Sequence, residues 1–260
     1  MFNLARTALV TLLSVVSASA FAAGNRIDYD VDNDGLIEIY DLADLDEIRR
    51  NLDGSSLYGV STGCPETGCN GFELMADLDF DTNGDGVMDD QDTYWNDGLG
   101  WEPIASYDAG IGFTGNFDGN MHSIYNLYIN RPESWWVGLF SFIGYSKPDE
   151  VLKTLPRQYI RNLFLTDNLT EVTAGDYAGL LAGIITATNV ENFIVSGRVF
   201  SGGNSGIFAG ALIFVAAEKL LVSGEVSIFE NNEYYGGVTS EAFFLTLNNV
   251  FSNSSLLTIS

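Results

Sequence analysis

The second half of the chain is built from a repeat, and this repeat restricts the possible folds more than any other feature of the sequence. A glycine followed by two apolar residues and one further, mostly small, residue occurs four times. An apolar segment follows each glycine at an offset of 22, 11, 11 or 10 residues, and the polar insert Lys147 to Arg157 accounts for the longer first offset. The glycine motifs span residues 138–141, 179–182, 206–209 and 237–240, and the apolar segments span 160–165, 190–195, 217–222 and 247–252.

A repeat of about 30 residues with β-rich segments and Gly and Asn turns is typical of a β-solenoid, in which each coil buries its apolar face on the next. Two neighbouring units also share the pattern Val-Ser-Gly-x-Val, at residues 195–199 and 222–226. We therefore expect a mainly β chain in which residues 121–260 form a right-handed parallel β-solenoid that begins with Ser123 to Ile129. A sandwich of many short strands is the alternative, although a sandwich does not require fixed offsets within each unit.

Residues 1–23 have the layout of a secretory signal peptide. Arg6 precedes an apolar run from Ala8 to Val16, and small residues follow this run. A membrane anchor, the alternative, needs about 20 unbroken apolar residues, and the run is shorter. The next-longest apolar stretch, Gly206 to Ala217, is also too short to span a bilayer. We therefore expect no membrane span and a chain that is secreted or displayed at the cell surface.

Export changes the interpretation of the two cysteines. Cys64 and Cys69 lie in a turn-rich loop, and an oxidising compartment favours pairing them. A zinc site would need more ligands than two cysteines and the single His122 can supply. We expect one disulfide that holds this loop locally, with two free thiols as the alternative.

The charge of the chain is strongly negative and unevenly spread. The sequence contains 35 acidic and 11 basic residues, a net charge of −24, which argues against nucleic acid as the main partner because phosphates would be repelled. Residues 24–120 hold 23 of the acidic residues and three of the basic ones. We therefore treat residues 24–120 as an acidic region with its own chemistry, leading into the repeats.

Two segments of this acidic region match the spacing of an EF-hand calcium loop. Each has acidic or amide side chains at positions 1, 3 and 5, glycine at position 6 for the sharp turn, and aspartate in place of the usual glutamate at position 12. We expect two structural calcium ions, with a solvated acidic turn as the alternative at each place. The predicted ligands are Asp30, Asp32, Asp34, Leu36 through its carbonyl, Glu38 and Asp41 in the first loop, and Asp81, Asn83, Asp85, Val87 through its carbonyl, Asp89 and Asp92 in the second.

The segments that follow the two loops differ. Leu42, Leu45, Ile48 and Leu52 lie at helical spacing with Asp41 available as N-cap, whereas no helix-forming segment follows the second loop. A calcium sensor reorients two helices, so a single helix favours a structural role for calcium. The loops resemble the EF-hand-like loops of dockerins and thrombospondin-type repeats.

The glycine repeats resemble the GLUG motif, named for Gly-Leu-any-Gly, of bacterial surface proteins and some immunoglobulin A peptidases. Ser141, Ala182, Ala209 and Ser240 stand where that motif has its closing glycine, so the resemblance implies an architecture but no binding residue. The runs at 79–86, 101–104 and 117–120 look like the segment that precedes such repeats in exported bacterial proteins. The resemblance covers most of residues 28–255 and implies an extracellular or surface protein with an adhesive role.

Catalysis has less support in the sequence. Some β-helical polysaccharide lyases combine calcium with an arginine or lysine base, and Arg131, Arg157 and Arg161 could be such bases. No nucleophile motif or histidine dyad accompanies them, and His122 fits a structural or surface role. We expect a protein without catalysis and keep a polysaccharide lyase as the alternative.

Aromatic side chains offer a contact surface instead. Trp95, Trp101, Trp135 and Trp136 could stack on sugar rings if they are exposed, and packing in the core is the alternative. Trp135 and Trp136 are adjacent, so on a strand only one of them can face the core. The expected function is therefore contact with a glycan or another surface by a calcium-stabilised β-solenoid.

Overall fold

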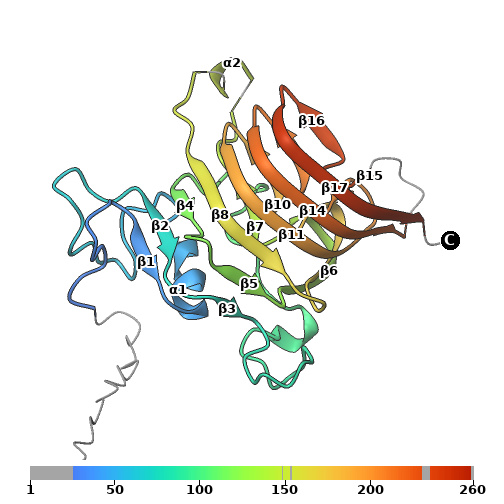
Figure 1. The fold of residues 1–260 in the computed structure, drawn as a ribbon, viewed down its shortest axis with the longest axis horizontal. Helices are drawn as coiled ribbons and strands as arrows, with labels where there is room; N and C mark the ends of the chain where they lie inside the picture. The colour runs from blue at the N-terminus through green and yellow to red at the C-terminus, as the bar shows by residue number, and fades with distance from the viewer. Residues whose placement is uncertain (1–25, 148, 153, 230–234, 259–260) are drawn as a thin grey trace, which may run out of the picture.

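The computed structural model describes residues 26–147, 149–152, 154–229 and 235–258. The predicted signal peptide, residues 1–23, lies outside these described residues. The described part of the chain is mainly β, with 48% of residues in strands and 6% in helices. Its strands pair in parallel within two sheets that lie one behind the other in Figure 1. The mainly β, parallel character expected from the repeat is confirmed.

The longer sheet contains a parallel series of strands drawn from both halves of the chain (Figure 1). In the order in which they pair, these strands are β1 (Ile37–Ile39), β2 (Gly71–Leu74), β4 (Asn116–Asp118), β8 (Tyr159–Thr166), β11 (Asn189–Ser201), β14 (Ala216–Ile228) and β17 (Thr246–Thr258). The last four contain the apolar segments of the four repeats, which pair in register as a repeat predicts.

The stack does not begin at Ser123 to Ile129, as the sequence led us to expect. Three strands, β1, β2 and β4, precede β8 in the sheet, so this prediction was wrong. Each of these strands has only three or four residues and follows no glycine motif, so the repeat pattern does not reveal them. Ser123 itself begins β5 (Ser123–Tyr125), which pairs with the end of β8 and with β3 (Leu78–Asp79).

The glycine motifs lead into the second sheet. This sheet consists of β7 (Phe140–Ile143), β10 (Ala182–Thr186), β13 (Ala209–Ile213) and β16 (Glu241–Phe243), all parallel. A Cβ atom added to Gly179 would lie 2.4 Å from the Cα of Ala209 in the next repeat, closer than van der Waals contact allows. The motif therefore places a glycine against a small residue of the next repeat because the two backbones touch there.

The shared Val-Ser-Gly-x-Val pattern lies near the middle of the long strands. Val195 and Gly197 of β11 are in register with Val222 and Gly224 of β14. The part of β11 before this pattern pairs with β8, and the part after it pairs with β9 (Glu171–Ala178), which in turn pairs with β6 (Tyr128–Val137). One long strand thus joins two neighbours that lie end to end.

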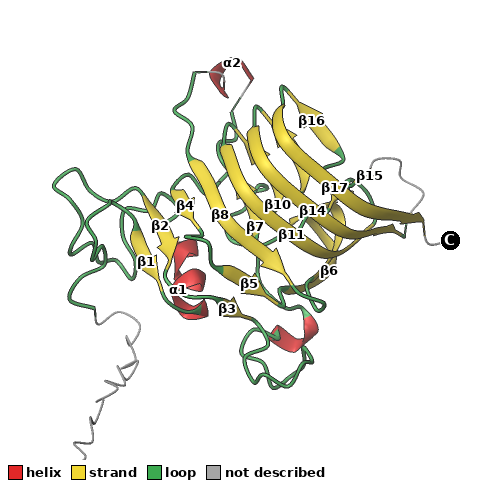
Figure 2. Ribbon diagram, in the orientation of Figure 1, coloured by secondary structure: helices red, strands yellow, loops and turns green. Residues whose placement is uncertain are grey.

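Helices are few and short (Figure 2). The remaining elements are α1 (Leu42–Glu47), α2 (Asp149–Leu152), the 3-10 turns η1 (Ile48–Arg50) and η2 (Asn96–Gly98), and the two-residue strands β12 (Ser205–Gly206) and β15 (Tyr235–Gly236). The predicted helix after the first loop is confirmed, with Asp41 as its N-cap accepting from the Asp44 amide at 2.9 Å. α1 ends at Glu47 and η1 continues the helical segment to Arg50, so it stops before Leu52, with Asn51 already outside the helical conformation.

The main hydrophobic cluster extends through the described parts of both regions. It contains Tyr29, Ile37 and Leu45 from the acidic region and reaches Val226 and Ile228 of β14 in the repeats. The acidic region therefore packs on the same core as the repeats, and its loops are held by the edge of that core.

Candidate functional site

The first acidic loop curls around a buried carboxylate. Asp30 is fully buried, and its two oxygens accept hydrogen bonds from the amides of Asp34 and Gly35, both at 3.0 Å. Asp34 in turn accepts from the amide of Leu36 at 2.8 Å. Gly35, at position 6, has a φ of +87°, a left-handed conformation that favours glycine. The loop therefore turns where the calcium-loop spacing requires.

The second acidic loop has the same hydrogen-bond pattern. Asp81 accepts from the amides of Asp85 at 3.2 Å and of Gly86 at 2.7 Å, as Asp30 does from the residues four and five positions on. Asp85 accepts from the amide of Val87 at 2.9 Å. Gly86, at position 6, has a φ of +83°. Asn83, at position 3, accepts from the Asp85 amide at 2.8 Å.

The twelfth positions of the two loops differ. Asp41 is exposed and caps α1, so its carboxylate is directed to a helix amide. Asp92 is buried and closes its own loop, accepting from the Thr82 amide at 2.7 Å and from the Asp89 amide at 3.0 Å. The spacing therefore sets the turn in both loops, while the neighbouring structure decides what the last carboxylate does.

Carboxylate oxygens converge in and beside the first loop. One group brings oxygens of Asp30, Asp32 and Asp34 within 4.8 Å of one another. A second group brings oxygens of Asp32, Glu38 and Glu73 within the same distance. Glu73 lies on β2, outside the loop, directly opposite Glu38 of β1. Carboxylates at this spacing are a donor set that suits a hard cation such as Ca²⁺.

Burial and mutual repulsion both act on the carboxylates in and beside the first loop. Burial raises the pKa of the Asp30 and Glu38 carboxyls, and nearby carboxylates raise both further. Burial also raises the pKa of Glu73 to about 7, with Asp34 and Asp32 contributing next. Held together in the charged form, these groups are costly without a counter-charge, and a divalent cation would supply one.

Glu73 was not among the ligands predicted from the sequence. The residue lies outside both loop motifs, and its closeness to the first loop depends on the pairing of β1 with β2. A signal was nevertheless present, because Ile37-Glu38-Ile39 and Phe72-Glu73-Leu74 share an acidic residue between two apolar ones. In a buried strand this pattern places an acid where only a partner or a metal can satisfy it.

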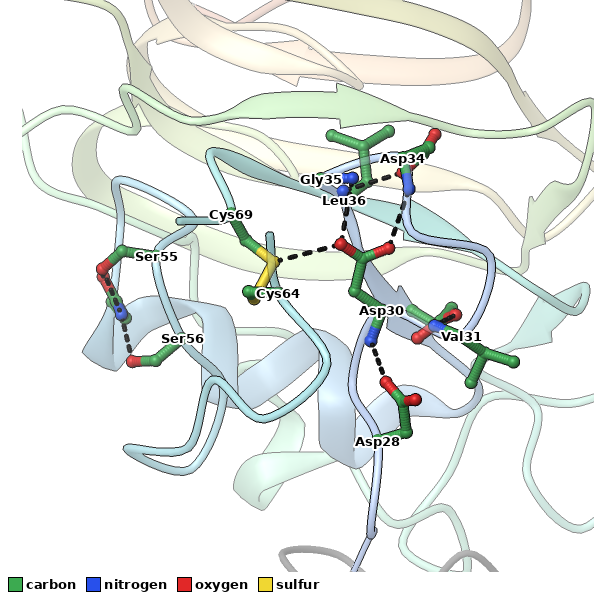
Figure 3. The surroundings of a disulfide bond; sticks show 12 residues. Asp28, Asp30, Val31, Asp34, Gly35, Leu36, Ser55, Ser56, Cys64 and Cys69 are labelled. Atoms are coloured by element: carbon green, nitrogen blue, oxygen red, sulfur yellow. Dashed lines mark hydrogen bonds between the residues drawn. A yellow bond between two sulfur atoms is a disulfide. The ribbon is translucent and has the colours of Figure 1, made fainter. Parts of the chain in front are cut away.

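The predicted disulfide is confirmed and lies against the first loop (Figure 3). Cys64 and Cys69 are joined, with their Cα atoms 5.2 Å apart. The Cys69 sulfur lies 3.6 Å from an Asp30 oxygen, a packing contact because a disulfide sulfur carries no proton to donate. For the same reason neither sulfur is a thiolate ligand for a metal. The bridge thus packs the cysteine loop onto the buried carboxylate.

The four tryptophans occupy different environments. Trp101 is buried, and its indole N–H donates to the Leu139 carbonyl at 3.1 Å, so its ring has no surface for a sugar. Trp95 is half-buried and stacks on Tyr128 with ring centres 5.2 Å apart. Trp136 is half-buried between two tyrosines, and Trp135 is 58% exposed.

Trp135 and Trp136 line an open polar cleft of about 460 Å³ beside the end of β6. Trp136 contributes a ring already stacked on Tyr177 at 4.0 Å, whereas Trp135 keeps most of its surface free. The other residues that line the cleft include three acids and one arginine, namely Glu102, Asp108, Glu133 and Arg131. The arrangement offers one free aromatic surface surrounded by hydrogen-bonding groups.

The three arginines considered as candidate bases have different surroundings. Arg131 lines the cleft and its Nε donates to the Trp101 carbonyl at 3.3 Å, and burial lowers its pKa. Arg157 is exposed, and Arg161 pairs with Asp118 at 2.6 Å. His122 lies 3.0 Å from the Asp77 carboxylate near the surface.

Comparison with known proteins gives limited matches. No family model matches the chain. It is 33% identical over 131 residues, half of its length, to Halomucin of Haloquadratum walsbyi, and the match spans about 1% of that protein. A crystal structure of a "putative immunoglobulin A1 protease" from Bacteroides ovatus aligns with a TM-score of 0.44 and 14% identity, covering 86% of this chain and 68% of that one. Within the described residues, no helix is long and apolar enough to cross a membrane.

Proposed function

We propose that this chain is a secreted or cell-surface protein, stabilised by two calcium ions, that binds neutral glycans without catalysis. The observation that carries the glycan proposal is the cleft lined by the exposed ring of Trp135. An exposed aromatic face with polar neighbours suits a pyranose ring, because the ring's apolar face packs on the indole while its hydroxyls form hydrogen bonds.

The charge of the cleft narrows the class of ligand. Glu102, Asp108 and Glu133 surround a single cation, Arg131, and the whole chain carries a net charge of −24. A polyanionic glycan would be repelled by this field. Neutral oligosaccharides therefore fit better than uronic-acid polymers, which are the substrates that a polysaccharide lyase would need.

Calcium is proposed for both acidic loops as a structural ion. The donor set of the first loop fits, since oxygens of Asp30, Asp32 and Asp34 lie within 4.8 Å of one another on a tightly curled backbone with glycine at position 6. The second loop is included because it has the same turn, with glycine at position 6 and Asp81 accepting from the Gly86 amide at 2.7 Å. Bound calcium would supply positive charge to the buried carboxylates. We extend the proposal to the fold itself: the in-register pairing of three successive repeats supports a right-handed β-solenoid with the GLUG-like repeats as its coils.

Glycan binding is tested by titrating a panel of neutral and acidic oligosaccharides while following tryptophan fluorescence. We expect neutral oligosaccharides to bind and Trp135→Ala to weaken binding at least about fivefold, since stacking on one aromatic side chain is worth about 1–3 kcal/mol, a range established for nucleic-acid bases. Phe251→Ala is the matched control, because Phe251 is also exposed and lies on β17 rather than in the cleft. Equal loss in both variants, or release of unsaturated products from acidic polysaccharides, would contradict the proposal.

The calcium proposal is tested by thermal unfolding with and without a chelator. A ligand at 100 times its dissociation constant stabilises a folded chain by about 2.7 kcal/mol per site. We therefore expect a chelator to lower the unfolding midpoint by several degrees and added calcium to restore it. An unchanged midpoint would contradict structural calcium.

A further inference from the structure

We propose that Glu73 of β2 is a ligand of the cation held by the first loop, so that one ion joins the first two strands of the long sheet. The inference rests on the proposed calcium site of that loop and adds a ligand from outside it. Glu73, together with Glu38 and Asp32, would then do what the twelfth residue does in an EF-hand loop. Asp41, the residue at that position, is directed to the helix.

The register of the long sheet aligns three acidic side chains. Glu38, Glu73 and Asp118 are directly opposite one another on β1, β2 and β4. Neighbouring strands lie about 4.7–4.9 Å apart, and like charges directly opposite destabilise a sheet. Three acids in one column therefore require counter-charges.

The third acid of the column has its counter-charge. Asp118 accepts from the Arg161 Nε at 2.6 Å and from the Asn162 amide nitrogen at 2.9 Å. It also accepts from the backbone amide of Asn120 at 2.8 Å. The protein thus supplies a counter-charge to Asp118 from its own side chains, and Glu38 and Glu73 still require one.

The first two acids are buried and each has an oxygen without a partner. Glu38 is 1% exposed and Glu73 is 6% exposed. Among the described residues, Glu38 Oε2 and Glu73 Oε1 have no hydrogen-bond partner, and neither carboxylate forms an ion pair with lysine or arginine. The nearby Arg26 is directed elsewhere, to the Glu38 backbone carbonyl and the Asp44 carboxylate.

The spacing of the oxygens matches a shared ion. Oxygens of Asp32, Glu38 and Glu73 lie within 4.8 Å of one another. Ligand oxygens lie about 2.3–2.6 Å from Ca²⁺, so two of them on opposite sides of one ion are about 5 Å apart. Unpaired buried carboxylates are among the most costly groups in a protein, and a cation between them removes that cost.

The experiment is a calorimetric titration of the chelator-treated exported chain with Ca²⁺. Asp81→Asn is introduced first to disable the second loop, so that the heat reports the first loop alone. In this background we expect Glu73→Gln to weaken calcium binding at least tenfold. Glu66→Gln, which removes an exposed carboxylate from the neighbouring cysteine loop, should change binding less than twofold.

A second measurement separates a lost ligand from a misfolded variant. With chelator present, Glu73→Gln should raise the unfolding midpoint, because it removes a buried charge that lacks a partner. With calcium present, the same variant should lower the midpoint. A structural defect would lower it in both conditions, and that result would overturn the inference.

The outcomes also distinguish this inference from the proposed function. If the unmodified chain binds no calcium, this inference and the calcium part of the proposed function both fail. If it binds two ions and Glu73→Gln leaves the first-loop affinity unchanged, only the role of Glu73 fails. A third ion that Glu73→Gln abolishes, with both loops still binding, would likewise overturn the inference.

Discussion

The first acidic loop, residues 30–41, contains β1 and so belongs to the long sheet, whereas the second, residues 81–92, contains no strand and leads into a stretch with only a 3-10 turn. Both have the same turn, with the carboxylate at position 1 bound to amides four and five residues on. Asp30 and Asp81 are both buried, at 0% and 8% exposure, but at position 7 Leu36 is buried whereas Val87 is 53% exposed. The same motif is thus part of the core in one place and a surface loop in the other.

The difference between the two loops shows which part of the motif is determined by residues close in sequence. Hydrogen bonds from a carboxylate to nearby amides, and a glycine at position 6, determine the turn in both loops. What the carboxylate at position 12 binds depends on the neighbouring structure, since Asp92 accepts a hydrogen bond within its own loop while Asp41 caps a helix. Sequence spacing alone therefore predicts the turn better than it predicts the complete ligand set.

The largest expected effect in this comparison is that of changing position 1. Asn at position 1 would keep the shape of Asp but would set an amide N–H₂ against a backbone N–H, because both carboxylate oxygens accept hydrogen bonds. We expect Asp30→Asn to cost about 3 kcal/mol, and Asp81→Asn about 1 kcal/mol, because only Asp30 is fully buried.

Thermal unfolding with a chelator present checks this difference, because the loss of a bound calcium ion then adds nothing to either value. For a chain of this size about 2–4 °C of midpoint corresponds to 1 kcal/mol, so Asp30→Asn should lower the midpoint by about 6–12 °C and Asp81→Asn by about 2–4 °C. Each variant serves as the control for the other, since the chemical change is identical. Equal losses would mean that the surroundings of the two loops do not matter.

Much of the fold follows from local patterns in the sequence. The offsets of the apolar segments predict the pairing of β8, β11, β14 and β17, because a repeat must place equivalent residues side by side. The N-cap at Asp41 and the bridge between Cys64 and Cys69 follow from residue type and short spacing. These features depend on residues close in sequence or on the repeat.

The features that the sequence did not reveal depend on contacts between distant segments. The three short strands β1, β2 and β4 have no repeat to mark them, and the closeness of Glu73 to Glu38 follows only from their register. The burial of Trp101 likewise depends on packing against Phe80 and a hydrogen bond to Leu139. Periodicity within one segment does not specify which distant segment covers it.

The disulfide offers a further test of the difference between the two acidic loops, with a smaller expected effect, because the bridge lies against the first loop only. Removing both sulfurs with Cys64→Ser and Cys69→Ser frees a short loop, a loss of about 2 kcal/mol by the chain-entropy estimate. Because the Cys69 sulfur packs 3.6 Å from an Asp30 oxygen, we also expect weaker calcium binding at the first loop. Titration in the Asp81→Asn background measures that loop alone.

The second loop supplies the control for the disulfide. In the Asp30→Asn background only the second loop should bind calcium, and removal of the bridge should leave its affinity unchanged within twofold. The Gly35 carbonyl accepts from the Asn70 amide at 3.0 Å, so the cysteine loop also supports the turn through its backbone. If the double serine variant weakens both loops equally, the bridge acts on the stability of the whole chain. A loss confined to the first loop would show that the bridge shapes that loop, because a global effect would reach both.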